Sequence, residues 1–163
     1  MPTVVSDTSP VRALAHLGHL DWLELLFQRV LLPPAVAAEL ESPPAGLPVV
    51  DVPVWSFLAV RAPASADRVS ELRALLDPGE AEAIALAEEL QADLVLIDEL
   101  SGRRVARQSG FIVLGTLGIL LEAKRLGLCS EVRGLLDRLQ NEIHFFVSTD
   151  LRQTILQQAG EPG

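Results

Sequence analysis

The stretch PGEAEAIALAEELQADLVLIDELSGRRVARQSG, residues 78–110, predicts a helix, a strand and a second helix in direct succession. Apolar residues recur at helical spacing over residues 80–91, so this segment is expected to form a helix with one buried face. The continuous apolar run LVLI, residues 94–97, is typical of a strand that is buried on both faces. A second helix is expected over residues 102–108. A buried strand between two helices is the repeating unit of a parallel sheet, which is therefore the predicted core.

The same alternation of short apolar strands and helices continues on both sides of this stretch. Strands are predicted at residues 3–5, 30–32, 94–97 and 112–114, with an edge strand near residues 54–60 and a last strand or edge at residues 143–147. The first helix is expected to be capped by Thr8 or Ser9, with Pro10 at its first helical position. These elements predict one domain over residues 1–163, an α/β fold with three α/β/α layers around a central parallel sheet.

The composition sets limits on location and partners. The chain has 163 residues, and none of its apolar runs approaches the roughly 18–20 residues that a membrane span requires. The single cysteine, Cys129, allows no internal disulfide and no signal peptide is visible, so we expect a cytoplasmic protein without membrane contact. The net charge of −9 argues against a broad, nonspecific nucleic-acid binder, although a pocket of metal-binding acids would itself add negative charge.

Four acidic residues are candidates for one site because of where they fall in the predicted elements. Asp7 and Asp98 each follow a predicted strand, and ligands of parallel sheets bind outside the carboxyl ends of the strands. Glu39 and Glu80 each lie on the apolar face of a predicted helix, where a carboxylate costs free energy unless something pairs with it. We therefore expect these four side chains to lie at one edge of the sheet.

Each of these acids also has an ordinary structural alternative. Asp7 and Glu80 fit the first turn of a helix, where the helix dipole favours a negative charge. Glu39 could reach solvent from the edge of its apolar stripe, and Asp98 could cap the helix that follows it. Glu82 is the rival of Glu80 if the helix is rotated from the predicted orientation.

As a group, the four carboxylates predict a cation site. Close carboxylates repel one another and raise one another's pKa values unless a cation neutralises them. A ligand set made only of oxygen atoms suits Mg²⁺ or Mn²⁺, and such ions hold phosphates and activate water for in-line attack. A zinc site is not expected, because His16, His19 and His144 have no second His or Cys at ligand spacing.

Most of the chain resembles one known family, through four stretches. These are VVSDTSPVRALAHLGHL (residues 4–20), VLLPPAVAAEL (30–40), the stretch 78–110 quoted above, and IVLGTLGILLEAKRLG (112–127). They are similar to the PIN-domain superfamily, in an uncharacterised prokaryotic branch close to the VapC-type toxin ribonucleases. The family's four acidic positions match Asp7, Glu39, Glu80 and Asp98, although many relatives carry Asp at the third of these.

The resemblance implies a PIN-like fold and a metal-dependent ribonuclease. Such a protein is often the toxin of a toxin–antitoxin pair, held by a small antitoxin protein, and is often a homodimer. Its catalytic residues would be Asp7, Glu39, Glu80 and Asp98, with Asp7, Glu80 and Asp98 as the ligands of Mg²⁺ or Mn²⁺. Candidate helpers are Thr8, Glu82 and Glu99. The alternative is a PIN-fold module that binds nucleic acid or protein without cutting.

Arginines and aromatic residues offer candidate RNA contacts. Arg103, Arg104 and Arg107 follow Asp98 on one predicted helix, where they could hold the RNA backbone beside the metal. The alternative is a solvated helix face paired with nearby acids. Trp22, Trp55 and Phe57 could stack bases, but packing in the core or in a dimer is the favoured interpretation.

Two other functions on a similar sheet fit the sequence less well. The haloacid-dehalogenase pattern requires a second Asp two residues after the first, and this chain has Ser9 there. A response-regulator receiver requires a paired acid beside its phosphoacceptor and a Lys late in the sheet. The only lysine of the chain, Lys124, lies in a predicted helix.

Overall fold

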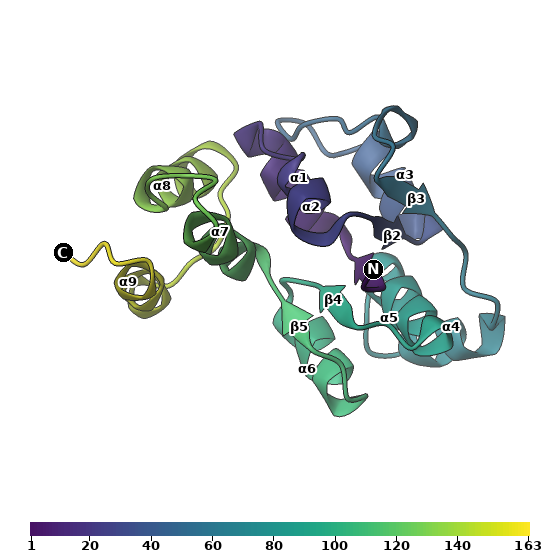
Figure 1. The fold of residues 1–163 in the computed structure, drawn as a ribbon. Coiled ribbons are helices and arrows are strands. Elements are labelled where there is room, and N and C mark those ends of the chain that lie inside the picture. Colours follow the sequence, from purple (N-terminus) through teal and green to yellow (C-terminus); the bar gives the residue numbers. More distant parts are fainter.

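The computed structural model describes residues 1–163 and contains one sheet of five parallel strands (Figure 1). The strands are β1 (Val4–Ser6), β2 (Val30–Leu32), β3 (Leu58–Val60), β4 (Leu94–Leu96) and β5 (Val113–Leu114), in the order β3-β2-β1-β4-β5. In the central strand, Val5 pairs with Leu31 on one side and with Val95 on the other. The predicted parallel sheet is confirmed, and β1 ends directly before Asp7.

Nine α-helices and one 3₁₀ turn connect and cover the strands. The helices are α1 (Thr8–Leu17), α2 (Trp22–Phe27), α3 (Pro34–Glu41), α4 (Ala66–Leu72), α5 (Pro78–Leu90), α6 (Leu100–Gln108), α7 (Thr116–Arg125), α8 (Arg133–Glu142) and α9 (Thr149–Gln158), and the 3₁₀ turn η1 is Val52–Val54. Gly18 ends α1 with a φ of 77°, a left-handed conformation that glycine adopts without strain. None of these helices combines the length and the apolarity needed to cross a membrane.

The two faces of the sheet pack against different helices, because successive strand residues point to opposite sides. Val4 and Leu96 belong to the larger core, which includes residues from α1, α2, α7, α8 and α9. Val5 and Val95 belong to a second cluster, whose helical members come from α5. Helices therefore cover both faces, which confirms the predicted three-layer α/β/α sandwich.

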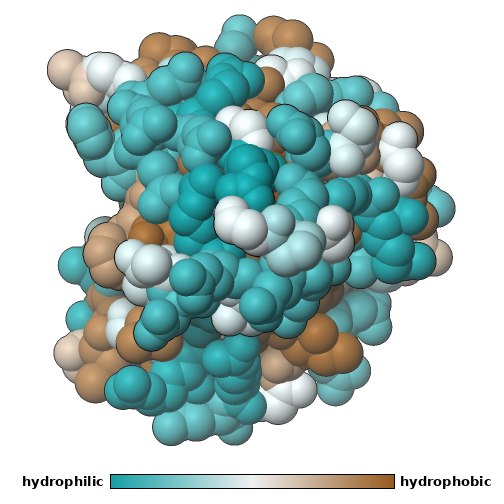
Figure 2. Space-filling view, turned by 90° about the vertical axis from the view of Figure 1, so that its left-hand side faces the viewer, coloured by the Kyte–Doolittle hydropathy of each residue, from teal (hydrophilic) through white to brown (hydrophobic).

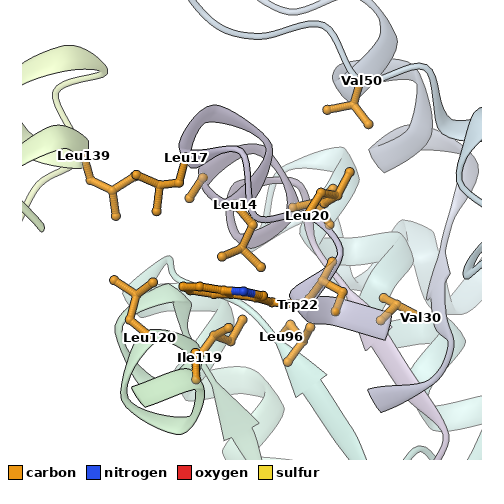
Figure 3. Close-up of a cluster of buried hydrophobic side chains, with 14 of the residues drawn as sticks. Leu14, Leu17, Leu20, Trp22, Val30, Val50, Leu96, Ile119, Leu120 and Leu139 are labelled. Carbon is orange, nitrogen blue, oxygen red and sulfur yellow. The ribbon is translucent and has the colours of Figure 1, made fainter. Parts of the chain in front are cut away.

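The larger core is built around Trp22, which is only 3% exposed. Figure 3 shows its ring between Leu14 of α1 and Leu120 of α7. Trp55 and Phe57 pack edge to face against each other, with ring centroids 5.7 Å apart, and both contact the same core. The sequence-based preference for core packing over base stacking is therefore confirmed for these three aromatic residues.

The helices α7, α8 and α9 form one side of the molecule, on the left of Figure 1. Figure 2 views the molecule from that side and shows a mainly hydrophilic surface with separate hydrophobic patches. Glu161 fixes the end of the chain there: its carboxylate accepts from Lys124 Nζ at 2.8 Å and from the backbone N–H groups of Val132 and Arg133 at 2.7 and 3.0 Å. One carboxylate thus ties the C-terminal segment to α7 and to the start of α8.

Two of the predicted strands differ from the structure. Residues 143–147 form no strand, because His144 has a left-handed φ of 55° that interrupts an extended backbone. The segment instead folds back on α8, where the Phe145 N–H donates to the Leu139 carbonyl at 2.9 Å. The predicted edge strand 54–60 is shorter than expected, since only Leu58–Val60 pairs with β2 and the η1 turn precedes it.

Candidate active site

The carboxyl end of β1 places Asp7 at the centre of the candidate site. Its backbone N–H donates to the Leu96 carbonyl of β4 at 2.9 Å, so strand pairing fixes its position. Asp7 is also the N-cap residue of α1, but its side chain makes no capping hydrogen bond. The predicted cap at Thr8 or Ser9 was wrong, because both residues already lie in the helix. The residue is 5% exposed, so its carboxylate is buried without being used as a cap.

Glu39 reaches the same edge from α3. Its Oε2 accepts a hydrogen bond from Thr8 Oγ1 at 2.8 Å, so the predicted helper Thr8 contacts a candidate catalytic residue directly. Asp7 Oδ1 and Glu39 Oε1 each lie 3.0 Å from the position that a Cβ on Gly79 would occupy. The two carboxylates are therefore neighbours across the first turn of α5.

Glu80 is buried in the first turn of α5, where it is 4% exposed. The backbone N–H of Glu80 donates to Asp77 Oδ1 at 2.8 Å, and the Glu80 side chain accepts in return from the Asp77 N–H at 3.4 Å. This pair of bonds is a capping box. It uses Oε1 of Glu80 only, and Oε2 is a buried oxygen without any hydrogen-bond partner.

Asp98 is held by the start of α7 instead of by the helix that follows it in sequence. Its two carboxylate oxygens accept from the Thr116 N–H at 2.7 Å and from Thr116 Oγ1 at 2.6 Å. The N-cap position of α6 belongs to Glu99, which makes no side-chain cap. Asp98 thus lies at a helix N-terminus, where the backbone dipole favours its negative charge.

Glycines leave the space in which these acids lie. A Cβ on Gly102 would lie 2.6 Å from Glu80 Oε2, and one on Gly115 would lie 2.8 Å from Asp98 Oδ1. Gly79 has the same relation to Asp7 and Glu39, as described above. Any larger residue at these three positions would meet a candidate site carboxylate at less than an ordinary contact distance.

The electrostatics of the edge favour protonated acids in the absence of a cation. Burial raises the pKa of Asp7 from 3.8 to about 7, and the charges of Asp77, Glu39 and Asp98 add to the rise, while the Thr8 N–H lowers it. Burial also raises the pKa of Glu80 from 4.5 to about 8, helped by the hydrogen bond and charge of Asp77 and by the charge of Asp7. Negative charge at this edge is therefore only partly compensated by the protein itself.

The donor set at the edge fits a hard divalent cation in its chemistry. All the donors are carboxylate oxygens, two of the residues are buried, and Glu80 Oε2 has no partner. In this structure, no three His, Cys, Asp or Glu side chains stand close enough together to hold a metal ion as one group. The edge thus has the right ligands and an uncompensated charge, without a closed ligand cage.

The helper candidates Glu82 and Glu99 lie outside this acidic edge in different ways. Glu82 is half-buried on α5, and its Oε1 accepts from the Ala35 N–H of α3 at 3.3 Å. Its role in this structure is to connect two helices, so Glu80 and not Glu82 is the buried acid of α5. Glu99 is exposed beside Asp98.

Of the three candidate RNA-binding arginines, only Arg103 adjoins the acids. Its Nη1 donates to the Ile97 carbonyl at 3.0 Å and lies 2.7 Å from the same Gly115 Cβ position that Asp98 approaches. Arg104 and Arg107 are exposed on α6. None of the three arginines makes an ion pair in this structure, so they do not form the helix face paired with nearby acids that was the alternative.

Two residues that contact the site acids were not singled out from the sequence. Asp77 adds negative charge near Asp7 and completes the capping box with Glu80. The spacing of Asp77 and Glu80 is the usual signature of such a box and could have revealed it. Thr116, the partner of Asp98, carries no comparable signal in the sequence.

A groove with a volume of about 790 Å³ begins at this edge and extends along α7 and α9; we call it the α7–α9 groove. Its polar end is formed by Ser9, Asp98, Glu99 and Arg103. The rest is lined by residues of β5, α7 and α9, by Leu100 and Gly115, and by the segment 144–146. The acids therefore adjoin a space that is large enough for an organic ligand.

Comparison with known proteins agrees with this fold. A search of curated proteins found no match to the chain. A family model described as a PIN domain matches residues 3–161, which is nearly the whole chain. PIN domains have a nuclease-type fold. On this match and on the parallel α/β/α architecture, the chain belongs to the PIN-domain family.

Proposed function

We propose that this protein is a metal-dependent endoribonuclease that hydrolyses RNA phosphodiester bonds at the acidic edge of its sheet. The observation that carries the proposal is the burial of the Asp7 and Glu80 carboxyl groups, which raises both pKa values because no cation of the protein pairs with them, together with the unpartnered Oε2 of Glu80. Acids are kept in such an environment when a ligand supplies the missing positive charge. Asp7, Glu80 and Asp98 would hold Mg²⁺ or Mn²⁺, and Glu39 would complete the acidic edge.

The ion would neutralise the carboxylates, stabilise charge on a phosphodiester and lower the pKa of a water molecule. The protein's own groups orient the edge for this. Thr8 fixes one oxygen of Glu39, and Thr116 fixes both oxygens of Asp98, so neither carboxylate can rotate freely. Arg103 is anchored on a backbone carbonyl beside Asp98 and has no carboxylate partner, which leaves its guanidinium able to bind a phosphate.

The proposal includes the biological setting that the sequence resemblance implies. On this proposal the protein is the toxin of a toxin–antitoxin pair, is held inactive by a small antitoxin protein, forms a homodimer and acts in the cytoplasm. Exposed apolar side chains such as Leu25 and Leu126 offer surface for such contacts. Co-purification from the native host and sedimentation of the purified chain would test the antitoxin and the dimer separately.

A second candidate function is a PIN-fold module that binds nucleic acid or protein without cutting it. Two observations favour it: the acids form no closed ligand cage, and the net charge is −9. A scaffold of this kind would keep the fold and the groove while the acids served only as local charges. Metal-dependent turnover distinguishes the two functions.

The test is cleavage of a mixed panel of single-stranded and structured RNAs with Mn²⁺, Mg²⁺ or EDTA. Wild type is compared with Asp7→Asn and with Asp67→Asn, which changes an exposed acid in the first turn of α4. The nuclease proposal expects metal-dependent cleavage by wild type and Asp67→Asn and its loss in Asp7→Asn. Full activity of the double variant Asp7→Asn/Asp98→Asn would show that the site is elsewhere. Absence of cleavage with any metal, in a sample that Mn²⁺ also fails to stabilise, would favour the non-catalytic module.

A further inference from the structure

Phe146 is the most exposed aromatic side chain of the protein, and the fold makes no use of it. The residue is 88% exposed at the rim of the α7–α9 groove and belongs to none of the hydrophobic clusters. Its neighbours behave differently, since Phe145 packs against the larger core and Val147 is buried. An aromatic ring kept in water beside a groove is therefore available for contact with a ligand.

Most of the groove lining contributed by α7 and α9 is apolar. It includes Leu117 and Leu121 of α7 and Ile155 of α9, and the polar side chains of His144 and Gln158 also line the groove. The three apolar side chains are part of, or packed against, the larger core, so this wall of the groove is held in place by the fold. A flat hydrophobic group could lie against this wall and on the Phe146 ring without any rearrangement of the core.

The opposite end of the groove has a different chemistry. Arg103 is anchored by the Ile97 carbonyl at 3.0 Å and makes no ion pair, and Asp98 lies directly beside it. A guanidinium in this state suits a phosphate. The groove thus joins a phosphate-binding end to an aromatic, apolar end, and a nucleotide joins the same two chemistries in one ligand.

The geometry points to Phe146 as a stacking residue for an unpaired base of single-stranded RNA whose phosphodiester lies at the acidic edge. This inference rests on the proposed function and assigns to Phe146 the contact with one base of the substrate. A base within a duplex is already stacked on its neighbours, whereas an unpaired base can turn its face to the ring. An apolar protein segment would cover Phe146 but would leave Arg103 and Asp98 without a matching group.

The charges lining the groove add a prediction about salt. Arg103 is the only arginine or lysine in the lining, and Asp98 and Glu99 oppose it. Few counterions would be released on binding, so the salt-dependent part of the affinity should be small. We therefore expect the Kd for single-stranded RNA to change less with salt than it does for proteins that neutralise many phosphates.

The experiment measures binding of short single-stranded RNAs that contain 2-aminopurine and hydrolysis-resistant phosphorothioate linkages, in Mg²⁺, so that the acidic edge has its cation and no turnover is needed. Wild type is compared with Phe146→Ala, Phe146→Trp and Leu75→Ala, the last being an exposed apolar residue outside the groove. Phe146→Ala is expected to weaken binding by roughly 5- to 150-fold, the range that corresponds to about 1–3 kcal/mol per stacked base. Phe146→Trp should restore binding and 2-aminopurine quenching, and Leu75→Ala should match wild type. A duplex of the same sequence should bind more weakly than the single strand.

Several outcomes would overturn the inference. One is an unchanged Kd for single-stranded RNA in Phe146→Ala, and another is a wild-type protein that binds none of the single-stranded RNAs. A third is that Phe146→Ala changes only the self-association of the protein, measured by sedimentation. The last outcome would identify Phe146 as a protein contact. Binding that depends on Phe146 in a protein that cuts no RNA with any metal would contradict the proposed nuclease while leaving the stacking role intact.

Discussion

Replacing Asp7 with Asn is expected to stabilise the metal-free protein at neutral and alkaline pH. Asn has nearly the same shape but carries no charge, so it avoids the cost of an ionised carboxylate at a buried position. Burial and the neighbouring acids raise the pKa of Asp7 from 3.8 to about 7. A rise of this size corresponds to at most about 4 kcal/mol of lost stability once the residue is ionised.

The pH dependence has a definite sign. Below the unfolded-state pKa near 3.8, both the folded and the unfolded protein hold the proton, and the cost is absent. As the pH rises toward about 7, the unfolded chain releases this proton while the folded protein retains it, so the free energy of unfolding falls. Above about pH 7 the cost is complete and constant. The advantage of Asp7→Asn should therefore be small near pH 4 and largest above pH 7.

The assay is urea unfolding in EDTA at several pH values between 4 and 8.5, followed by circular dichroism, for wild type, Asp7→Asn and Asp67→Asn. We expect Asp7→Asn to gain about 1–4 kcal/mol at the upper end of this range, and the exposed Asp67→Asn to change by less than about 0.5 kcal/mol. With Mn²⁺ at 100 times its Kd, wild type should gain about 2.7 kcal/mol and Asp7→Asn should lose most of that gain. An Asp7→Asn protein that is less stable than wild type at pH 8 without metal would refute the reasoning.

Three further predictions concern the groups around the acids. Gly79→Ala places a methyl group 3.0 Å from two site carboxylate oxygens, so the affinity for Mn²⁺ and the cleavage rate should each fall at least tenfold. The control Gly134→Ala in α8 should leave both unchanged. Thermal shifts with Mn²⁺ measure the affinity, and cleavage assays measure the rate. Thr116→Val removes the hydroxyl that holds Asp98 and should reduce the cleavage rate about 10- to 100-fold with a small change in urea midpoint, and an unaltered rate would remove Thr116 from the site. Glu161→Gln should lower the free energy of unfolding by about 1–3 kcal/mol at pH 7. Because the folded protein holds the pKa of Glu161 low, this difference should shrink as the pH falls below the ordinary glutamate pKa. Equal stability of the two proteins at pH 7 would contradict the role of Glu161 in tying the C-terminal segment to α7 and α8.

The sequence predicted the fold where the apolar runs were continuous. Residues 30–32 and 94–97 have no polar interruption, and they contain the strands Val30–Leu32 and Leu94–Leu96, which are buried except for the half-buried Leu94. The run IHFFV at residues 143–147 is also mainly apolar, but it contains His144 and forms no strand. The left-handed backbone at His144 and the hydrogen bond from Phe145 to Leu139 decide its course, and neither follows from local hydrophobicity.

The site was predictable to the extent that it depends on strand ends and helix starts. The positions of Asp7 and Asp98 after strands follow from parallel-sheet geometry, and the structure places both at one edge. What each carboxylate contacts was not predictable, because those contacts link distant parts of the chain. The bond from Thr116 to Asp98 depends on how β5 returns beside β4, and the anchoring of Arg103 depends on a side-chain rotamer.

The acidic edge combines close-fitting glycines with buried acids that lack a full set of partners, and this coincidence is the strongest physical argument that it binds a ligand. Gly79 and Gly102 lie in the first turns of α5 and α6, and a side chain at Gly102 would also meet Ile97. Alanine at either position would press on a carboxylate. Asp7 and Glu80 are buried, and the capping box that Glu80 forms with Asp77 still leaves Oε2 of Glu80 without a partner. The space that the glycines leave and the burial of these acids have a common explanation if a cation occupies the edge, and that explanation holds for a nuclease and for a binding module alike.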